Sequence, residues 1–92
     1  MKREDPLRWL KANGHDLAGL TGSDTLALRA IAALWELYAV ERKSMVLPAV
    51  TLVLAHLQPK YHFFAKQLIA YSMDWSDREH LWSVVAPIGA GA

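Results

Sequence analysis

Four histidines are the side chains best suited to metal binding or proton transfer in this 92-residue chain. They are His15, His56, His62 and His80. Helical metal sites commonly place two histidines four residues apart, so that both reach one ion from the same face. No pair here has that spacing, and His56 and His62 lie on opposite sides of Pro59. We interpret the histidines as ordinary surface or partly buried residues and predict no metal ligand.

The carboxylates and possible nucleophiles also form no catalytic pattern. Asp74, Asp77 and Glu79 gather where the last helix is expected to begin, and the positive end of the helix dipole stabilises acidic side chains there. The chain has no cysteine, which removes a thiolate ligand or nucleophile. The glycines between positions 14 and 22 lack the following Lys-Ser/Thr of a phosphate-binding loop. We therefore predict a non-enzymatic protein with no catalytic residue and no cofactor.

The composition is that of a folded protein with almost no net charge. Apolar residues make up 53% of the chain, and ten basic against nine acidic residues leave a net charge of +1. A nucleic-acid-binding domain is usually strongly basic, so nucleic acid is not the partner we expect. The longest apolar run, 45–57, is shorter than the about 20 residues that span a bilayer. Acids and a proline follow Lys2 and Arg3, unlike a secretory signal. We expect a cytoplasmic protein without membrane contact.

The apolar spacing between glycines and prolines is helical throughout. We predict a short helix over 6–13, capped by Asp5 and ended by Gly14, and a loop whose Leu17 and Leu20 reach the core. Four longer helices follow: about 24–42 after a Ser23 or Asp24 cap, 45–57 after Ser44, 59–73, and a fifth from a Ser76–Glu79 capping box to Pro87. This predicts an all-α fold, a compact bundle of four main helices plus a short N-terminal helix. The domain is expected to span 1–87, with a flexible tail over 88–92.

The helix at about 24–42 is expected to be the central one. Its polar residues fall on one narrow stripe, and nearly all the rest are apolar, which predicts neighbours on most sides. The stripe comprises Thr25, Arg29, Glu36 and Lys43. Trp35 and Trp82 are expected in the core. Helices as apolar as this one and 45–57 are hard to cover within so short a chain. We therefore predict that the protein binds itself as a homodimer, another protein, or both.

The helix at 59–73 offers a candidate binding surface. Its core face carries Tyr61, Phe64, Leu68 and Tyr71, and other apolar residues lie off that face among basic ones. Either the fifth helix covers these residues, or some remain exposed and bind a partner, as large exposed apolar patches usually do. The predicted partner-binding residues are Phe63, Ile69, Met73, Lys66 and His62, with Trp75 as a possible anchor.

The sequence thus favours a small protein–protein interaction module that acts by steric binding through an apolar patch with a basic rim. It would be an adaptor, an anti-activator or an inhibitor, for example one from a phage or other mobile element. The alternative is a helix-turn-helix-like DNA-binding protein that uses the helix starting at Pro59. In that case Lys60, His62, Lys66 and Gln67 would face the DNA. That helix carries few hydrogen-bond donors for bases or phosphates, and no arginine.

Overall fold

The computed structural model describes residues 4–73 and 78–86, and all regular structure within them is helical. The elements are α1 (Pro6–Ala12), α2 (Gly22–Glu41), α3 (Val46–Leu54), the 3₁₀ turn η1 (Pro59–Tyr61), α4 (His62–Ser72) and α5 (Arg78–Val85). The predicted all-α fold of four main helices plus a short N-terminal helix is confirmed. The proposed tail over 88–92, the anchor Trp75, and Ser76 of the predicted capping box lie outside the described residues.

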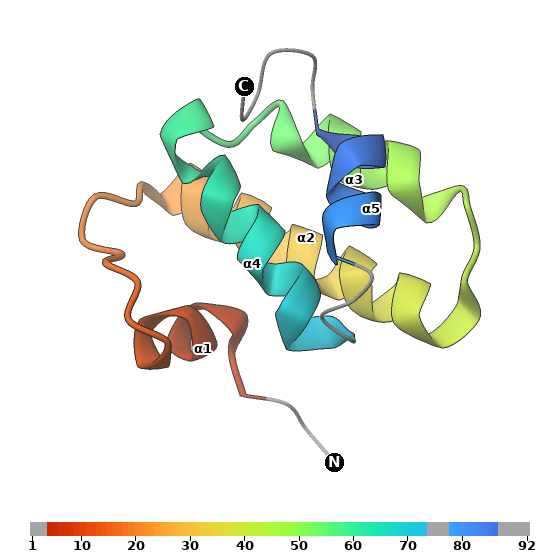
Figure 1. Ribbon diagram of the computed structural model, residues 1–92. Helices are drawn as coiled ribbons and strands as arrows, with labels where there is room; N and C mark the ends of the chain where they lie inside the picture. The colour runs from red at the N-terminus through yellow and green to blue at the C-terminus, as the bar shows by residue number, and fades with distance from the viewer. Residues whose placement is uncertain (1–3, 74–77, 87–92) are drawn as a thin grey trace.

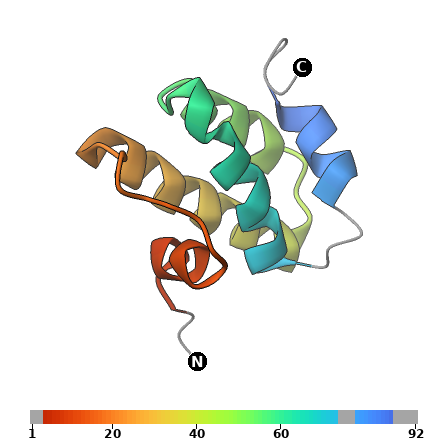
Figure 2. The same cartoon turned by 60° about the vertical axis from the view of Figure 1, so that its left-hand side comes forward.

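The helices pack around α2 and α4. α2 contacts α1, α3 and α4, whereas α5 packs against α3 and α4. In Figure 1, α4 lies in front of α2 and α5 lies in front of α3, while α1 sits below them. Figure 2 shows α2 and α5 on opposite sides of α4. One long face of α2 therefore points away from the bundle.

One apolar core joins all five helices. Trp35 lies at its centre with no exposed surface, and its indole Nε1 donates a hydrogen bond to the Ala65 carbonyl, 3.3 Å away. Trp82 is also buried, so both tryptophan predictions are confirmed. Leu17 and Leu20 pack against the core from the loop before α2, as expected. A buried indole with a hydrogen-bonded N–H fixes how α2 and α4 sit against one another.

The start of α2 differs from the prediction. Thr21, not Ser23 or Asp24, is the N-cap: its hydroxyl accepts a hydrogen bond from the Asp24 amide at 3.1 Å. The Asp24 carboxylate accepts the Thr21 amide in return, which completes a capping box. The same carboxylate also accepts the Gln58 backbone amide at 3.2 Å and the Gln58 side-chain amide at 2.6 Å. The cap of α2 therefore also holds the turn between α3 and α4.

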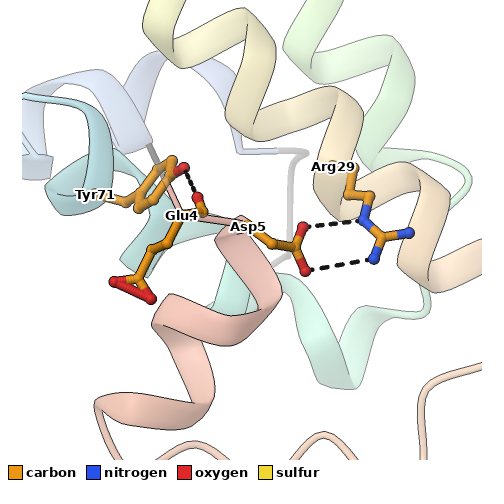
Figure 3. A network of polar contacts seen from close by, with 4 residues as sticks. All are labelled: Glu4, Asp5, Arg29 and Tyr71. Atoms are coloured by element: carbon orange, nitrogen blue, oxygen red, sulfur yellow. Dashed lines mark hydrogen bonds and ion pairs between the residues drawn. The ribbon is translucent and has the colours of Figure 1, made fainter. Parts of the chain in front are cut away.

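The N-terminal segment is fastened by two polar contacts, shown in Figure 3. Asp5 makes no side-chain cap for α1. Its carboxylate instead pairs with the Arg29 guanidinium of α2, with contacts of 3.1 and 3.4 Å. The Tyr71 hydroxyl of α4 donates a hydrogen bond to the Glu4 carbonyl. These contacts tie the chain before α1 to both central helices.

The other helix ends confirm one prediction and correct another. Gly14 has a φ of +89°, the left-handed conformation expected just past the end of α1. Ser44 is not a cap: α3 begins one residue later than predicted, with Met45 as N-cap and no side-chain hydrogen bond there.

Candidate functional site

The predicted binding stripe of α4 lies at an internal contact of the bundle. His62, Lys66, Ile69 and Met73 follow one another at spacings of four, three and four residues, so they share one side of the helix. The end of α3 and the start of α5 meet this side, as the contacts of His62 and Lys66 described below show. α4 therefore buries two sides, the predicted core face toward α2 and this stripe.

Two of the predicted surface residues are buried. Ile69 has no exposed surface and His62 keeps only 7% of its own. The His62 Nε2 lies 3.1 Å from the Leu54 carbonyl oxygen and 3.0 Å from that of Leu57. A ring nitrogen within hydrogen-bond distance of two carbonyl oxygens must carry a hydrogen. The His62 Nε2 therefore donates to these carbonyls, one in the last residue of α3 and one in the turn that follows it. Of the two alternatives for this side of α4, burial within the chain therefore holds for Ile69 and His62, because α3 and α5 meet that side.

Lys66, Met73 and Phe63, the other described residues of the predicted surface, do not form one patch. Lys66 is mostly covered, and its Nζ lies 3.0 Å from a carboxylate oxygen of Glu79 in α5. Met73 is half-buried and packs against the core. Phe63 is 55% exposed, but it lies on another side of α4, edge-on to the His15 ring with centroids 5.7 Å apart. The expected basic rim is lost because Lys66 is committed to an ion pair.

The geometry also gives little support to a helix-turn-helix reading. α3 and α4 are joined through a short turn and η1, as that reading requires. His62 points into the bundle rather than outward, however, and Lys66 is paired with Glu79. Two of the four proposed DNA-facing residues remain available: Lys60 is exposed and Gln67 is partly exposed. Two such side chains cannot supply the donors for phosphates and base edges that a recognition helix needs.

One hollow carries titratable side chains, but they do not form a reactive pair. It measures about 660 Å³ and is lined by Lys11, Gly14, His15, Asp16, Leu17 and Ala18. The Asp16 carboxylate accepts the Ala18 amide at 3.0 Å. The His15 ring packs edge-on against Phe63 and Phe64. Across the described parts of the chain, no three His, Asp or Glu side chains gather as a metal site would require.

The outward face of α2 is the first surface that the sequence analysis missed. The sequence predicted neighbours on most sides of this helix, yet four of its apolar residues reach solvent. They are Leu26, 68% exposed, Ala33, Leu37, and Val40, 82% exposed. With Ala30, which is half-buried, they recur at spacings of four, three, four and three residues. Below, "the α2 seam" means Leu26, Ala30, Ala33, Leu37 and Val40.

A groove between α3 and α5 is the second such surface. It is open, measures about 440 Å³, and is lined by Leu47, Pro48, Thr51, Leu52 and Val84. Leu52 is 71% exposed and Val84 about half-exposed. The one polar group in this lining, the Thr51 hydroxyl, donates to the Val85 carbonyl at 2.9 Å. This hydrogen bond anchors α5 on α3 and leaves an apolar lining, which we call the α3–α5 groove.

A sequence signal existed for the α2 seam but not for the groove. The four-three repeat of apolar residues is the pattern of a helix that packs against another helix. In the sequence of α2 this repeat is hard to distinguish, because the core residues of the helix are also apolar and more numerous. The groove depends on where α5 docks, and no spacing within α3 reveals that. Leu52 alone stands apart, opposite the Val46–Val50–Leu54 core side of α3.

Comparison of the chain with protein-family models, curated protein sequences and solved structures finds no match. Among the described helices, none combines the length and apolar character needed to cross a bilayer.

Proposed function

We propose that this protein is a non-enzymatic protein–protein interaction module whose partner-binding site is the α3–α5 groove. The observation that carries the proposal is the groove itself, lined by apolar side chains and open to solvent. Apolar grooves between helices are a common docking site for an amphipathic helix, whose side chains at positions i, i+3, i+4 and i+7 enter the groove. The partner class is therefore an apolar helical segment of another protein.

The class of function is the one predicted from the sequence, but the binding site lies in the α3–α5 groove instead of on α4. The exposed side chain of Leu52 on one side and Val84 on the other form the rim of the groove. A bound helix would remove both from water, and such burial is worth roughly 25 cal/mol per Å². Binding of this kind acts by covering the partner's segment, as expected of an adaptor, an anti-activator or an inhibitor. Because no basic rim borders the groove in its described lining, salt should weaken binding little.

A peptide-library selection tests this proposal. Helical peptides are selected against the full chain and then measured for binding to Leu52→Asp, which places a charge in the groove. Leu26→Asp is the matched control, since Leu26 is almost equally exposed but lies on α2. The proposal expects peptides with helical apolar spacing that bind the wild type and Leu26→Asp but lose at least about tenfold in affinity for Leu52→Asp. Peptides that bind all three equally, or no enriched peptide, would contradict it.

A further inference from the structure

We infer that the α2 seam is a self-association surface, through which two copies of the chain pair as an antiparallel, two-fold symmetric dimer. This surface does not include any groove residue, so the inference stands or falls apart from the proposed function. Three features carry it: the exposure of the seam, its internal symmetry, and the charges along one edge.

The seam is an exposed apolar stripe on an otherwise well-packed helix. Leu26 and Val40 are among the most exposed large apolar side chains of the described chain. α1, α3 and α4 occupy the other sides of α2, as Figure 1 shows, and none of them covers this one. A four-three repeat suits packing against a second helix, because the period of 3.5 residues keeps the apolar stripe facing its partner.

The order of four of the five seam side chains is self-complementary. In an antiparallel pair centred between Ala30 and Ala33, Leu26 of one copy lies opposite Leu37 of the other, and Ala30 lies opposite Ala33. Large residues thus meet on both sides of a small-residue centre, while Val40 comes opposite Ser23 beyond this paired region. Small central residues let two helices approach to the short end of the usual 8–10 Å separation.

The charges beside the seam select the antiparallel arrangement. Arg29 and Glu36 lie seven residues apart on the same edge of the seam. A two-fold axis across antiparallel helices brings this edge of one copy against the same edge of the other. The positions of Arg29 and of the second copy's Glu36 then lie within about 3 Å of each other along the axis, and this approach occurs twice. In a parallel pair the same edge would face the opposite one, which carries Ala27 and Leu34.

Arg29 is already held in position for such a contact. Its guanidinium pairs with Asp5, as drawn in Figure 3. The Arg29 side chain is about half exposed. A guanidinium has five N–H donors, so Arg29 can keep its pairing with Asp5 and also donate hydrogen bonds to a second carboxylate.

The size of the seam sets the expected strength. α2 has 20 residues and is therefore about 30 Å long. One such helix face is smaller than the roughly 800 Å² per partner of a standard interface. We therefore expect a reversible dimer that forms at micromolar concentrations, not an obligate one.

Cysteine pairing tests the arrangement directly, since the chain contains no cysteine of its own. The variants Leu26→Cys and Leu37→Cys are prepared separately. Each is oxidised by itself, and a mixture of the two is oxidised in parallel. In the antiparallel dimer the two positions face each other, whereas two copies of Cys at position 26 are about 16 Å apart, beyond disulfide reach. The inference expects cross-linked dimers mainly in the mixture. A parallel dimer would instead link each variant to itself.

Leu52→Cys is the matched control, because that side chain is equally exposed but lies in the groove. It should not link to itself or to the seam variants above the level of random collision. Equal cross-linking in all mixtures, or none in any, would overturn the inference.

Discussion

The Asp24 carboxylate is buried at the junction of α2 with the turn between α3 and α4. It accepts hydrogen bonds from the amide and hydroxyl of Thr21 and from the backbone and side-chain amides of Gln58. Burial raises the pKa of the Asp24 carboxyl, whereas these hydrogen bonds lower it, and the pKa ends below its usual value. A buried carboxylate is tolerated here because donors surround it.

This lowered pKa predicts a loss of stability in acid. Because the pKa of Asp24 is lower in the folded than in the unfolded chain, its stabilising contribution is present above about pH 4 and is lost as the pH falls through the folded value. Urea unfolding of the wild type and Asp24→Asn from pH 7 to pH 2 measures this. The two free energies of unfolding should differ at pH 7 and converge in acid. A difference that does not change with pH would contradict the prediction.

The N-cap of α2 gives a prediction with a built-in comparison. Thr21→Ala removes the hydroxyl that accepts the Asp24 amide and should lower the free energy of unfolding by about 1 kcal/mol. Ser23→Ala, at the position that the sequence favoured as the cap, should leave it unchanged within about 0.5 kcal/mol. Chemical denaturation of both variants measures the difference. The cap assignment would be wrong if Ser23→Ala were the more destabilising.

His62 should matter to stability and not to surface binding. His62→Phe removes the hydrogen bond that His62 donates to the Leu57 carbonyl, and an unsatisfied buried group costs about 1–3 kcal/mol. The Leu54 carbonyl also loses His62 but keeps the Leu57 amide, 3.0 Å away. His56→Phe, at an exposed position nearby, is the control and should be nearly neutral. Thermal and urea unfolding measure both. Equal stability of His62→Phe and the wild type would show that these hydrogen bonds are not important in solution.

At the scale of elements, apolar spacing predicted which segments are helical but not where α3 ends. A helix was expected over 45–57, whereas α3 stops at Leu54. The carbonyls of Leu54 and Leu57 accept hydrogen bonds from the His62 ring, and the Gln58 backbone amide donates a hydrogen bond to the Asp24 carboxylate. These partners come from other parts of the chain, so they cannot be seen in the local sequence.

The sequence also could not decide which side of α4 faces outward. The stripe of His62, Lys66, Ile69 and Met73 has helical spacing, and such a stripe serves equally well for a partner protein or for another helix of the same chain. The ion pair between Lys66 and Glu79 shows that α5 takes this place. Among the members of the predicted surface that the structure describes, only Phe63 remains largely exposed.

The docking of α5 should depend on one hydroxyl of α3. Thr51→Val keeps the shape of the side chain but leaves the buried Val85 carbonyl without the Thr51 donor. We expect faster amide hydrogen exchange in α5, by at least about fivefold, since one net hydrogen bond contributes about 1 kcal/mol. α2 should be much less affected. Ser83→Ala, which removes an exposed hydroxyl of α5 itself, is the control. Unchanged exchange in α5 of Thr51→Val would contradict this role.

At the scale of the molecule, most of the exposed large apolar residues lie on two surfaces. Composition and length predicted that the chain would be left with apolar surface to cover, and the structure places five such residues on the α2 seam and in the α3–α5 groove, with Met45 and Phe63 elsewhere. The two surfaces share no residue, so a dimer built through α2 would present two grooves. A partner with two binding segments would then gain apparent affinity from the link between them.

Self-association through the α2 seam is tested most directly by sedimentation equilibrium, which gives the solution mass of the whole chain across a range of concentrations. One copy has a mass of 10.3 kDa. We expect the average mass to rise from this value toward twice as much over the micromolar range in the wild type. Ala33→Glu, at the centre of the seam, should hold the mass at that of one copy, whereas Ala12→Glu, at an exposed position of α1, should behave as the wild type. A mass that stays at 10.3 kDa for the wild type at every concentration would contradict self-association through the α2 seam.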